Sequence, residues 1–184
     1  LQTTGSGSVT ISNKADTANG DVSQTGAITL VSGSTTANDE AVSITTAAGN
    51  VTIGGTFDSG KGSNFSDLTI ITAASGELVS SAGSVKVKDF TVVADEIALS
   101  NTANQIEATG TIAIRAATGG RAINLGTGTS GLDLRASELL AFKAGATEMV
   151  IGASNTSGAN ASTGTFTVAG ENVESKNALD IFAA

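Results

Sequence analysis

Residues 51–87 read VTIGGTFDSGKGSNFSDLTIITAASGELVSSAGSVKV, and this stretch contains the pattern that decides the fold. Three triplets, at residues 51–53, 68–70 and 85–87, place an apolar residue on each side of a polar one. Side chains of a β-strand alternate between two faces, so each triplet predicts a short strand with one buried face. Glycine, serine, asparagine and aspartate follow the triplets and predict turns.

The same kind of triplet recurs along the whole chain. Further copies begin at Val9, Ile28, Val42, Ile97, Ile112, Ile123, Leu132, Met149, Phe166 and Leu179. Alternation over so few residues indicates brief strands separated by turns. We therefore expect an all-β fold.

The spacing of the triplets predicts how the strands are stacked. An interval of 17 residues joins Val51 to Leu68 and Val85, Leu132 to Met149 and Phe166, Ile97 to Ile114, and Ile106 to Ile123. A fixed period of a few tens of residues is typical of a solenoid. The pattern favours a right-handed parallel β-helix, a single domain over residues 1–184, with coils of about 17 to 22 residues and roughly eight to eleven coils. In that arrangement Leu132, Met149 and Phe166 would lie directly over one another.

Two other folds are compatible with short strands. An antiparallel sandwich has turn signals at a similar spacing, but tight hairpin signals are nearly absent here and Asn19-Gly20 is the only Asn-Gly or Asp-Gly pair. A left-handed helix of hexapeptides would explain the spacing of Val87, Val93 and Leu99, but that rhythm does not continue.

One segment departs from the strand pattern and predicts a short helical excursion near residues 137–143. Ser137 is a suitable N-cap, Glu138 suits the first turn, and Gly145 follows the last good helix former. We expect Leu139, Leu140 and Phe142 to pack on the flank of the sheets.

Composition excludes several function classes. The 184 residues include no cysteine, histidine, proline, tryptophan or tyrosine, so no Ser-His-Asp triad, Cys-His pair or zinc finger can be built. A net charge of −8 repels nucleic acid and anionic lipid head groups. No apolar run is long enough to span a membrane, and the start at Leu1 indicates a mature or excised piece. Absence of cysteine is also compatible with secretion.

No constellation of residues points to a catalytic, cofactor or metal site. Asp133 and Arg135 flank Leu134 and are expected to face outward, with Arg115 and Arg121 on neighbouring coils, where they serve solubility. Neighbours in a strand face opposite sides, so the acid pairs Asp39-Glu40 and Asp95-Glu96 cannot chelate together unless they lie in a loop. Residues 54–58, GGTFD, resemble the calcium nonapeptide only faintly. We predict no catalytic, cofactor-binding or metal-binding residues and no enzyme activity.

The stretch from Ile123 to Val168 carries a resemblance to a known family. It reads INLGTGTSGLDLRASELLAFKAGATEMVIGASNTSGANASTGTFTV. This resembles a unit of the large bacterial exoproteins of the filamentous haemagglutinin type, also described as β-strand repeat proteins, with motifs "INLG", "L-x-L-[ST]-x-x-EL", "AG-x-L-x-IG" and "G-x-[IF]-x-V". Residues at the matching positions are Leu132, Leu134, Glu138, Leu139, Ala144, Gly145, Ile151, Gly152, Gly164, Phe166 and Val168. Residues 146–149, ATEM, depart from the usual Thr-Leu pair, and the unit covers about a quarter of the chain.

The resemblance implies a right-handed β-helical shaft exported by a Gram-negative cell, without catalytic residues. On this basis the chain is expected to be an internal or C-terminal shaft segment of an adhesin or surface fibre, extracellular or on the cell surface. Because a solenoid has unpaired strand edges at both ends, its expected partners are more of the same protein, either as subunits stacked end to end or as a continuation of the chain, and surface glycans or proteins, with no nucleic acid and no membrane insertion. A carbohydrate-active β-helix, as enzyme or binding module, and a self-assembling filament or surface-layer subunit are the alternative functions.

Overall fold

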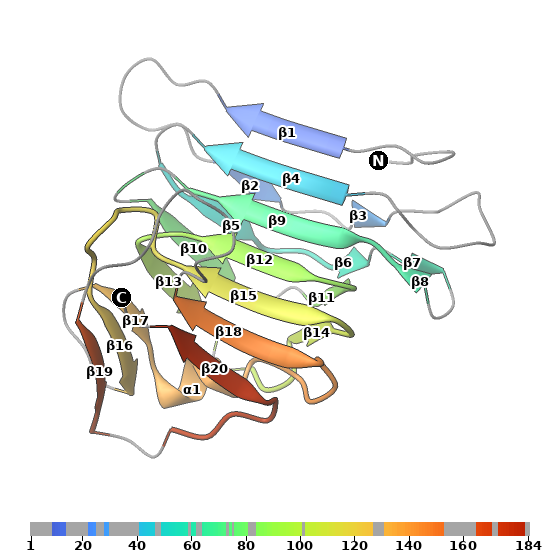
Figure 1. The fold of residues 1–184 in the computed structure, drawn as a ribbon. Helices are drawn as coiled ribbons and strands as arrows, with labels where there is room; N and C mark the ends of the chain where they lie inside the picture. Colours follow the sequence, from blue (N-terminus) through green and yellow to red (C-terminus); the bar gives the residue numbers. More distant parts are fainter. Residues whose placement is uncertain are drawn as a thin grey trace.

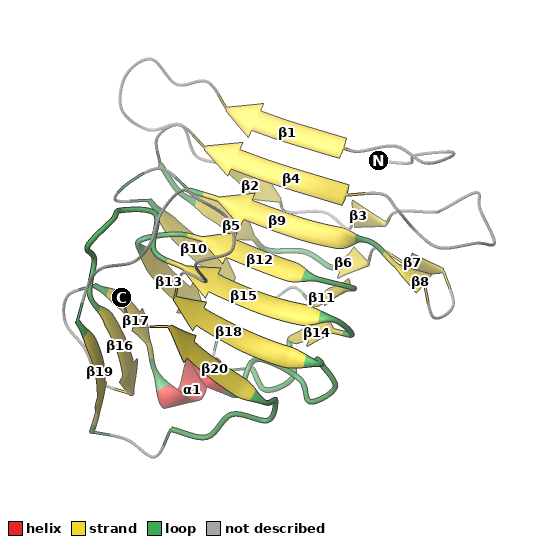
Figure 2. Cartoon of the chain, in the orientation of Figure 1, coloured by secondary structure: helices red, strands yellow, loops and turns green. Residues whose placement is uncertain are grey.

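The structure of the protein is a computed structural model, and it describes residues 9–13, 22–24, 28–29, 41–46, 49–58, 60–61, 64–72, 74, 76–80, 84–100, 102–126, 131–152, 165–170 and 173–182. Within these ranges the chain consists mainly of short strands in parallel sheets, together with one short helix (Figures 1 and 2). None of the described helices is long and apolar enough to cross a membrane.

The described strands form four parallel sheets and one hairpin. Sheet A runs in the order β1 (Val9–Asn13), β4 (Ala41–Thr46), β9 (Asp67–Ile71), β12 (Phe90–Val93), β15 (Thr111–Arg115), β18 (Glu148–Gly152) and β20 (Leu179–Phe182). Sheet B contains β13 (Glu96–Leu99), β10 (Glu77–Ser80), β5 (Val51–Ile53) and β2 (Val22–Gln24). Sheet C contains β14 (Ile106–Ala108), β11 (Val85–Val87), β6 (Phe57–Asp58) and β3 (Ile28–Thr29). Sheet E contains β17 (Leu132–Leu134), β16 (Ile123–Gly126) and β19 (Phe166–Ala169), and the antiparallel hairpin pairs β7 (Gly60–Lys61) with β8 (Asn64–Phe65).

The chain enters the sheets in a fixed order. It passes through sheets A, B and C with β1, β2 and β3, and repeats this order with β4-β5-β6, β9-β10-β11 and β12-β13-β14. After β15 it enters sheet E with β16 and β17, returns to sheet A at β18, and ends with β19 in sheet E and β20 in sheet A. All pairings in these four sheets are parallel, so the alternative of an antiparallel sandwich is wrong for the described strands.

The register of sheet A stacks apolar residues at two positions of every strand. From β1 to β20 the stacked pairs are Val9 and Ile11, Val42 and Ile44, Leu68 and Ile70, Phe90 and Val92, Ile112 and Ile114, Met149 and Ile151, and Leu179 and Ile181. In the five strands from β4 to β18 these side chains are at most 3% exposed. In β4 and β9 the residues between them are more exposed, whereas Ala113 in β15 and Val150 in β18 are buried as well. The triplets are thus short strands with one buried face, as the sequence predicts.

The predicted stacking at a spacing of 17 residues is wrong. Leu132 pairs with Ile123 in sheet E, Met149 pairs with Ile112 in sheet A, and Phe166 also pairs with Ile123. Residues 17 apart therefore lie mostly in different sheets. In sheet A, Leu68, Phe90 and Ile112 stack at intervals of 22 residues, whereas Val42 precedes Leu68 by 26.

Eight to eleven coils is also too many for the described residues, since the longest sheet has seven strands. The physical reason is that turns between strands differ in length. Met149 follows its partner Ile112 by 37 residues, and Ile123 precedes its partner Leu132 by only 9. Loop length changes the free energy of a fold only slowly, so the register in space does not require a constant period in sequence.

The helical excursion is shorter than predicted. Helix α1 spans Ala136–Leu139 and follows Arg135, so the predicted Ser137 cap is wrong. Its first turn is closed by Glu138, whose Oε2 accepts the Arg135 N–H at 2.8 Å.

The segment after α1 leaves the helix because it pairs with β14. The Ile106 N–H donates to Ala141 O at 2.9 Å, and the Lys143 N–H donates to Ile106 O at 2.7 Å. Leu139 and Phe142 are buried as expected, whereas Leu140 is 40% exposed. The helix and the segment behind it therefore cover the ends of sheets B and C.

The stacked core makes a direct stability prediction. Ile70→Ala should lower the free energy of unfolding by about 2 to 5 kcal/mol, because it opens a cavity in a fully buried position of sheet A. The matched control is Thr69→Ala on the outward face of the same strand, which should cost less than about 1 kcal/mol. Urea unfolding followed by circular dichroism measures both; equal losses would contradict the assigned faces.

Candidate functional site

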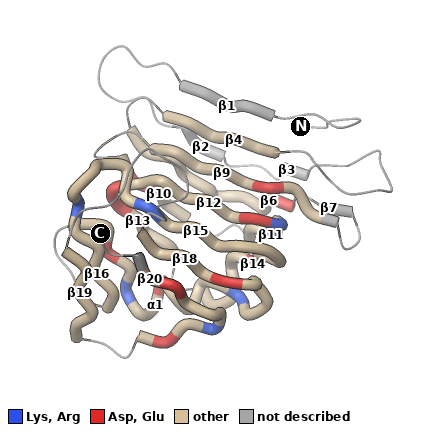
Figure 3. Tube along the Cα trace, in the orientation of Figure 1, with Lys and Arg blue, Asp and Glu red and all other residues tan. Residues whose placement is uncertain are grey.

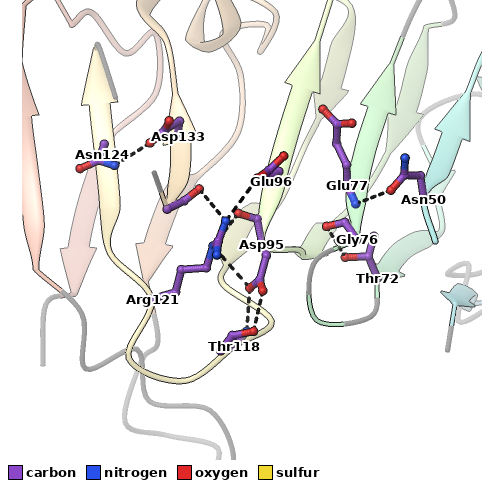
Figure 4. Close-up of polar contacts among 11 residues, drawn as sticks. Asn50, Thr72, Gly76, Glu77, Asp95, Glu96, Thr118, Arg121, Asn124 and Asp133 are labelled. Atoms are coloured by element: carbon purple, nitrogen blue, oxygen red, sulfur yellow. Dashed lines mark hydrogen bonds and ion pairs between the residues drawn. The ribbon is translucent and has the colours of Figure 1, made fainter. Parts of the chain in front are cut away.

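Polar side chains gather where the strands of sheets B and E begin (Figure 4). The centre of the group is Asp95, in the bend between β12 and β13, and Arg121, in the connection between β15 and β16. Asp95 and the neighbouring Glu96 differ sharply in exposure, at 2% and 62% of their side chains. Asp95 lies in a bend, one residue before β13, and Arg121 lies beside both carboxylates, so these acids are not the strand neighbours for which opposite faces were predicted.

Asp95 is a buried carboxylate whose oxygens are satisfied by Thr118. Oδ1 accepts the Thr118 N–H at 2.7 Å, and Oδ2 accepts the Thr118 hydroxyl at 2.5 Å. Arg121 lies beside the same residue: its Nε donates to Asp95 O at 2.9 Å and lies 3.8 Å from Oδ1. Burying a charge is costly unless it is paired and hydrogen-bonded, so this arrangement holds the 116–122 connection against the β12–β13 bend.

Arg121 extends this contact to a third part of the chain. One terminal nitrogen, Nη2, donates to Gly131 O at 3.3 Å and to Glu96 Oε1 at 3.4 Å. The exposed pair with Glu96 contributes little free energy by itself, because water screens it. Its effect is to position the guanidinium at the surface next to Glu96.

A row of polar residues precedes the strands of sheet B. Register places Asn50, Glu77 and Glu96 one after another, because Val51, Leu78 and Ile97 are strand partners. Asn50 Oδ1 accepts the Glu77 N–H at 2.9 Å. Partial burial, followed by repulsion from Glu96, raises the pKa of Glu77 above its ordinary value. Two carboxylates therefore stand side by side, one of them with Arg121.

Sheet E adds a second outward pair. Asn124 and Asp133 are strand partners, and the Asn124 side-chain amide donates to Asp133 Oδ1 at 2.5 Å. Leu134 is buried, Asp133 is partly exposed and Arg135 is exposed, so the predicted outward direction of these two charged residues is confirmed. Among the described residues, Arg121 forms ion pairs with Asp95 and Glu96, whereas neither Asp133 nor Arg135 forms one.

A separate row of acids lies at or directly before the first residue of strands in sheet A, and Figure 3 shows acidic segments at this end of the strands. Asp89 Oδ1 accepts the Thr111 N–H at 2.6 Å, and the Thr111 hydroxyl donates to Glu148 Oε1 at 3.4 Å. Burial, followed by repulsion from Asp89, raises the pKa of Asp67. A β-carbon at Gly110 would displace the Asp89 carboxylate from the position in which it accepts the Thr111 N–H. These acids order the corner between sheets C and A.

Glu138 is a buried acid with a structural role. Its Oε1 accepts the Leu99 N–H at 3.2 Å, and Leu99 ends the strand at the edge of sheet B. Burial raises the pKa of Glu138, and the hydrogen bonds from Arg135 and Leu99 oppose that shift. The side chain therefore satisfies a sheet edge that would otherwise leave an amide unpaired.

Sequence reasoning identified the adjacent acids but not the cluster. Residues 50, 77, 95 and 121 come together because their strands are neighbours in space, and their sequence separations carry no common period. Their position in the sequence could have predicted the row, because Asn50, Glu77 and Glu96 each stand directly before a strand triplet or an alternating run.

The Asp95 contacts predict a loss of stability on neutralisation. Asp95→Asn keeps the shape but replaces an oxygen acceptor by an NH₂ donor facing Thr118, so the free energy of unfolding should fall by about 1 to 3 kcal/mol. Glu96→Gln is the matched control and should change stability by less than about 1 kcal/mol, since that side chain is exposed. Equal stability of Asp95→Asn and the parent chain in urea unfolding would refute this role.

The raised pKa of Glu138 predicts a pH dependence. A group whose folded pKa lies above its unfolded value binds protons more readily in the folded chain, so stability from this group increases as pH falls from above the raised pKa toward about 4.5. Glu138→Gln should remove this contribution. The free energy of unfolding of the parent chain should therefore rise relative to that of the variant as the pH falls from about 7 to about 5. The exposed Glu174→Gln serves as control and should leave the pH dependence unchanged. Identical pH dependence of the parent chain and Glu138→Gln would contradict the assignment.

The exposed groups of the cluster are hydrogen-bond donors and acceptors. Carboxylates, side-chain amides and one guanidinium lie on neighbouring parallel strands, a set that suits hydroxyl groups of a polar ligand. In the part of the chain that the structure describes, no group of three acidic side chains is arranged to hold a metal ion. The chain matches no protein-family model, no curated protein and no solved structure.

Proposed function

We propose that this chain is a right-handed parallel β-helix that forms a stiff shaft of a bacterial adhesin or surface fibre outside the cell. The observation that carries the proposal is the repeated passage through sheets A, B and C with continuous parallel register. A chain that returns to the same sheet beside its previous strand winds around a common core. Right-handedness follows from the general preference of parallel crossover connections.

Stiffness is supported by hydrogen bonds at the corners as well as in the strands. Leu68 N donates to Asp89 O at 2.9 Å, Thr72 N to Val93 O at 2.9 Å, and Ala94 N to Arg115 O at 3.0 Å. These bonds continue the sheet ladders into the turns. One apolar cluster runs from Val42 to Ile151, so successive passes share a single core. Such a column resists bending because adjacent passes cannot separate without breaking ladder bonds and exposing apolar area.

The resemblance to exoproteins of the filamentous haemagglutinin type supports the location outside the cell. Its motif residues Leu132, Leu134, Leu139 and Ile151 are core residues of the structure. Because these motif residues are buried, they fit a repeating unit whose characteristic residues build the core. The outer face, with its polar rows, is then the part available to surface glycans or proteins.

The proposal is tested by locating the protein on cells. Antibodies against the purified chain should label intact cells of the organism that produces it, and external protease should remove the label. A cytoplasmic protein serves as the control and should be labelled only after permeabilisation. Labelling of this protein only after permeabilisation would refute the surface role.

A carbohydrate-active β-helix is the second candidate, and the row of Glu77 and Glu96 beside Arg121 favours it. Burial raises the pKa of Glu77, and a pair of carboxyl groups is the minimum for acid-base cleavage of a glycosidic bond. The parent chain would then release new reducing ends from polysaccharide, and Glu77→Gln would not. This result would support the enzyme and contradict the shaft. Binding of polysaccharide without cleavage would support the shaft.

A further inference from the structure

One junction between successive passes of the chain brings acidic residues face to face in two sheets. Strands β9-β10-β11 form one pass through sheets A, B and C, and β12-β13-β14 form the next; we call the contact between these two passes the acid junction. In sheet B, Glu77 and Glu96 are strand partners. In sheet A, the register between β9 and β12 places Asp67 opposite Asp89. Like charges directly opposite each other on neighbouring strands are destabilising.

The other described strand pairings of the parallel sheets do not place an acid opposite an acid. In sheet C, Lys86 pairs with Asp58 on one side and with Glu107 on the other, so opposite charges alternate there. In sheet A, Glu148 pairs with Thr111. The opposed acids therefore set the acid junction apart from the junctions on either side of it.

Basic side chains near the junction compensate only part of this charge. Lys88 Nζ lies 3.8 Å from Asp89 Oδ2, but the lysine side chain is 55% exposed, so water screens the pair. Arg121 Nη2 lies 3.4 Å from Glu96 Oε1, and the same guanidinium also pairs with the buried Asp95. Among the described residues, no base forms an ion pair with the other member of either acid pair.

The neighbouring passes add no further positive charge beside the four acids. On the side of the preceding pass, the acid pairs are followed by Ala41 in sheet A and by Asn50 in sheet B. On the side of the following pass, the Thr111 N–H donates to Asp89 Oδ1 at 2.6 Å, and Glu148 lies one strand further along sheet A. Removal of charge from the acids themselves is therefore the remaining way to relieve the repulsion.

A proton relieves the repulsion within each pair, because a protonated carboxyl donates a hydrogen bond to the carboxylate beside it. Burial, followed by repulsion from Asp89, raises the pKa of Asp67, and Lys88 opposes this shift. Burial, followed by repulsion from Glu96, raises the pKa of Glu77. Groups with a raised pKa in the folded chain bind protons more readily there than in the unfolded chain. Their contribution to stability therefore increases as the pH falls from above the raised pKa.

We propose that the acid junction is a pH-sensitive joint, which opens more readily when all four acids are charged and closes when each pair takes up a proton. Both acid pairs lie at the same junction, so protonation strengthens one contact of the column rather than the whole chain evenly. Acidification would stiffen the column at this point. The inference rests on the described strand pairings and does not depend on where the protein is located.

Amide hydrogen exchange of the purified 184-residue chain tests the joint. The Leu68 and Thr72 N–H groups donate to carbonyls at the two ends of β12, so both amides report opening of the acid junction. The Ala94 N–H donates to the last residue of β15, across the next junction, and is the reference. After correction for the intrinsic effect of pH, protection at Leu68 and Thr72 relative to Ala94 should rise about twofold or more between about pH 7.5 and about pH 5. An unchanged ratio would overturn the proposal.

Charge-removing variants test the joint by a second measurement. Asp67→Asn combined with Glu77→Gln takes one charge from each acid pair, so this variant should unfold at a higher urea concentration than the parent chain at about pH 7.5, and the difference should shrink toward about pH 4. The matched control, Glu174→Gln combined with Asp180→Asn, removes two charges at exposed positions outside the junction and should not show this pH-dependent gain. A junction variant that is no more stable than the parent chain at pH 7.5 would overturn the proposal. A failed surface-labelling experiment would leave both readouts unaffected.

Discussion

The parallel register of sheet A is the constraint on which the rest of the structure depends. It places one apolar residue over another at two positions in each of seven strands, from Val9 and Ile11 to Leu179 and Ile181. A slip of one residue would turn each buried side chain outward, so the hydrophobic effect fixes the register strongly. Sheets B, C and E complete the enclosure of the same core.

Polar residues stabilise mainly the turns in which the chain passes from one sheet to the next. Asp95 and Arg121 connect three parts of the chain, Asp89 orders the entry to β15, and Glu138 satisfies the last strand of sheet B. These contacts leave some charged groups at the surface, among them Glu77 and Glu96. The same corners that stabilise the sheets therefore also place charged groups at the surface.

Alternation of apolar and polar residues determined the strands, their buried faces and the all-β class from the sequence alone, because the strand period of two is a local property. The tertiary structure alone decided which strands stack. Leu68 meets Phe90 rather than Val51 or Val85, and Ile123 meets both Leu132 and Phe166, because turns of unequal length bring together residues with no constant separation. Burial and hydrogen bonding act between residues that are close in space, so the sites of Asp95 and Glu138 exist only once the sheets have assembled.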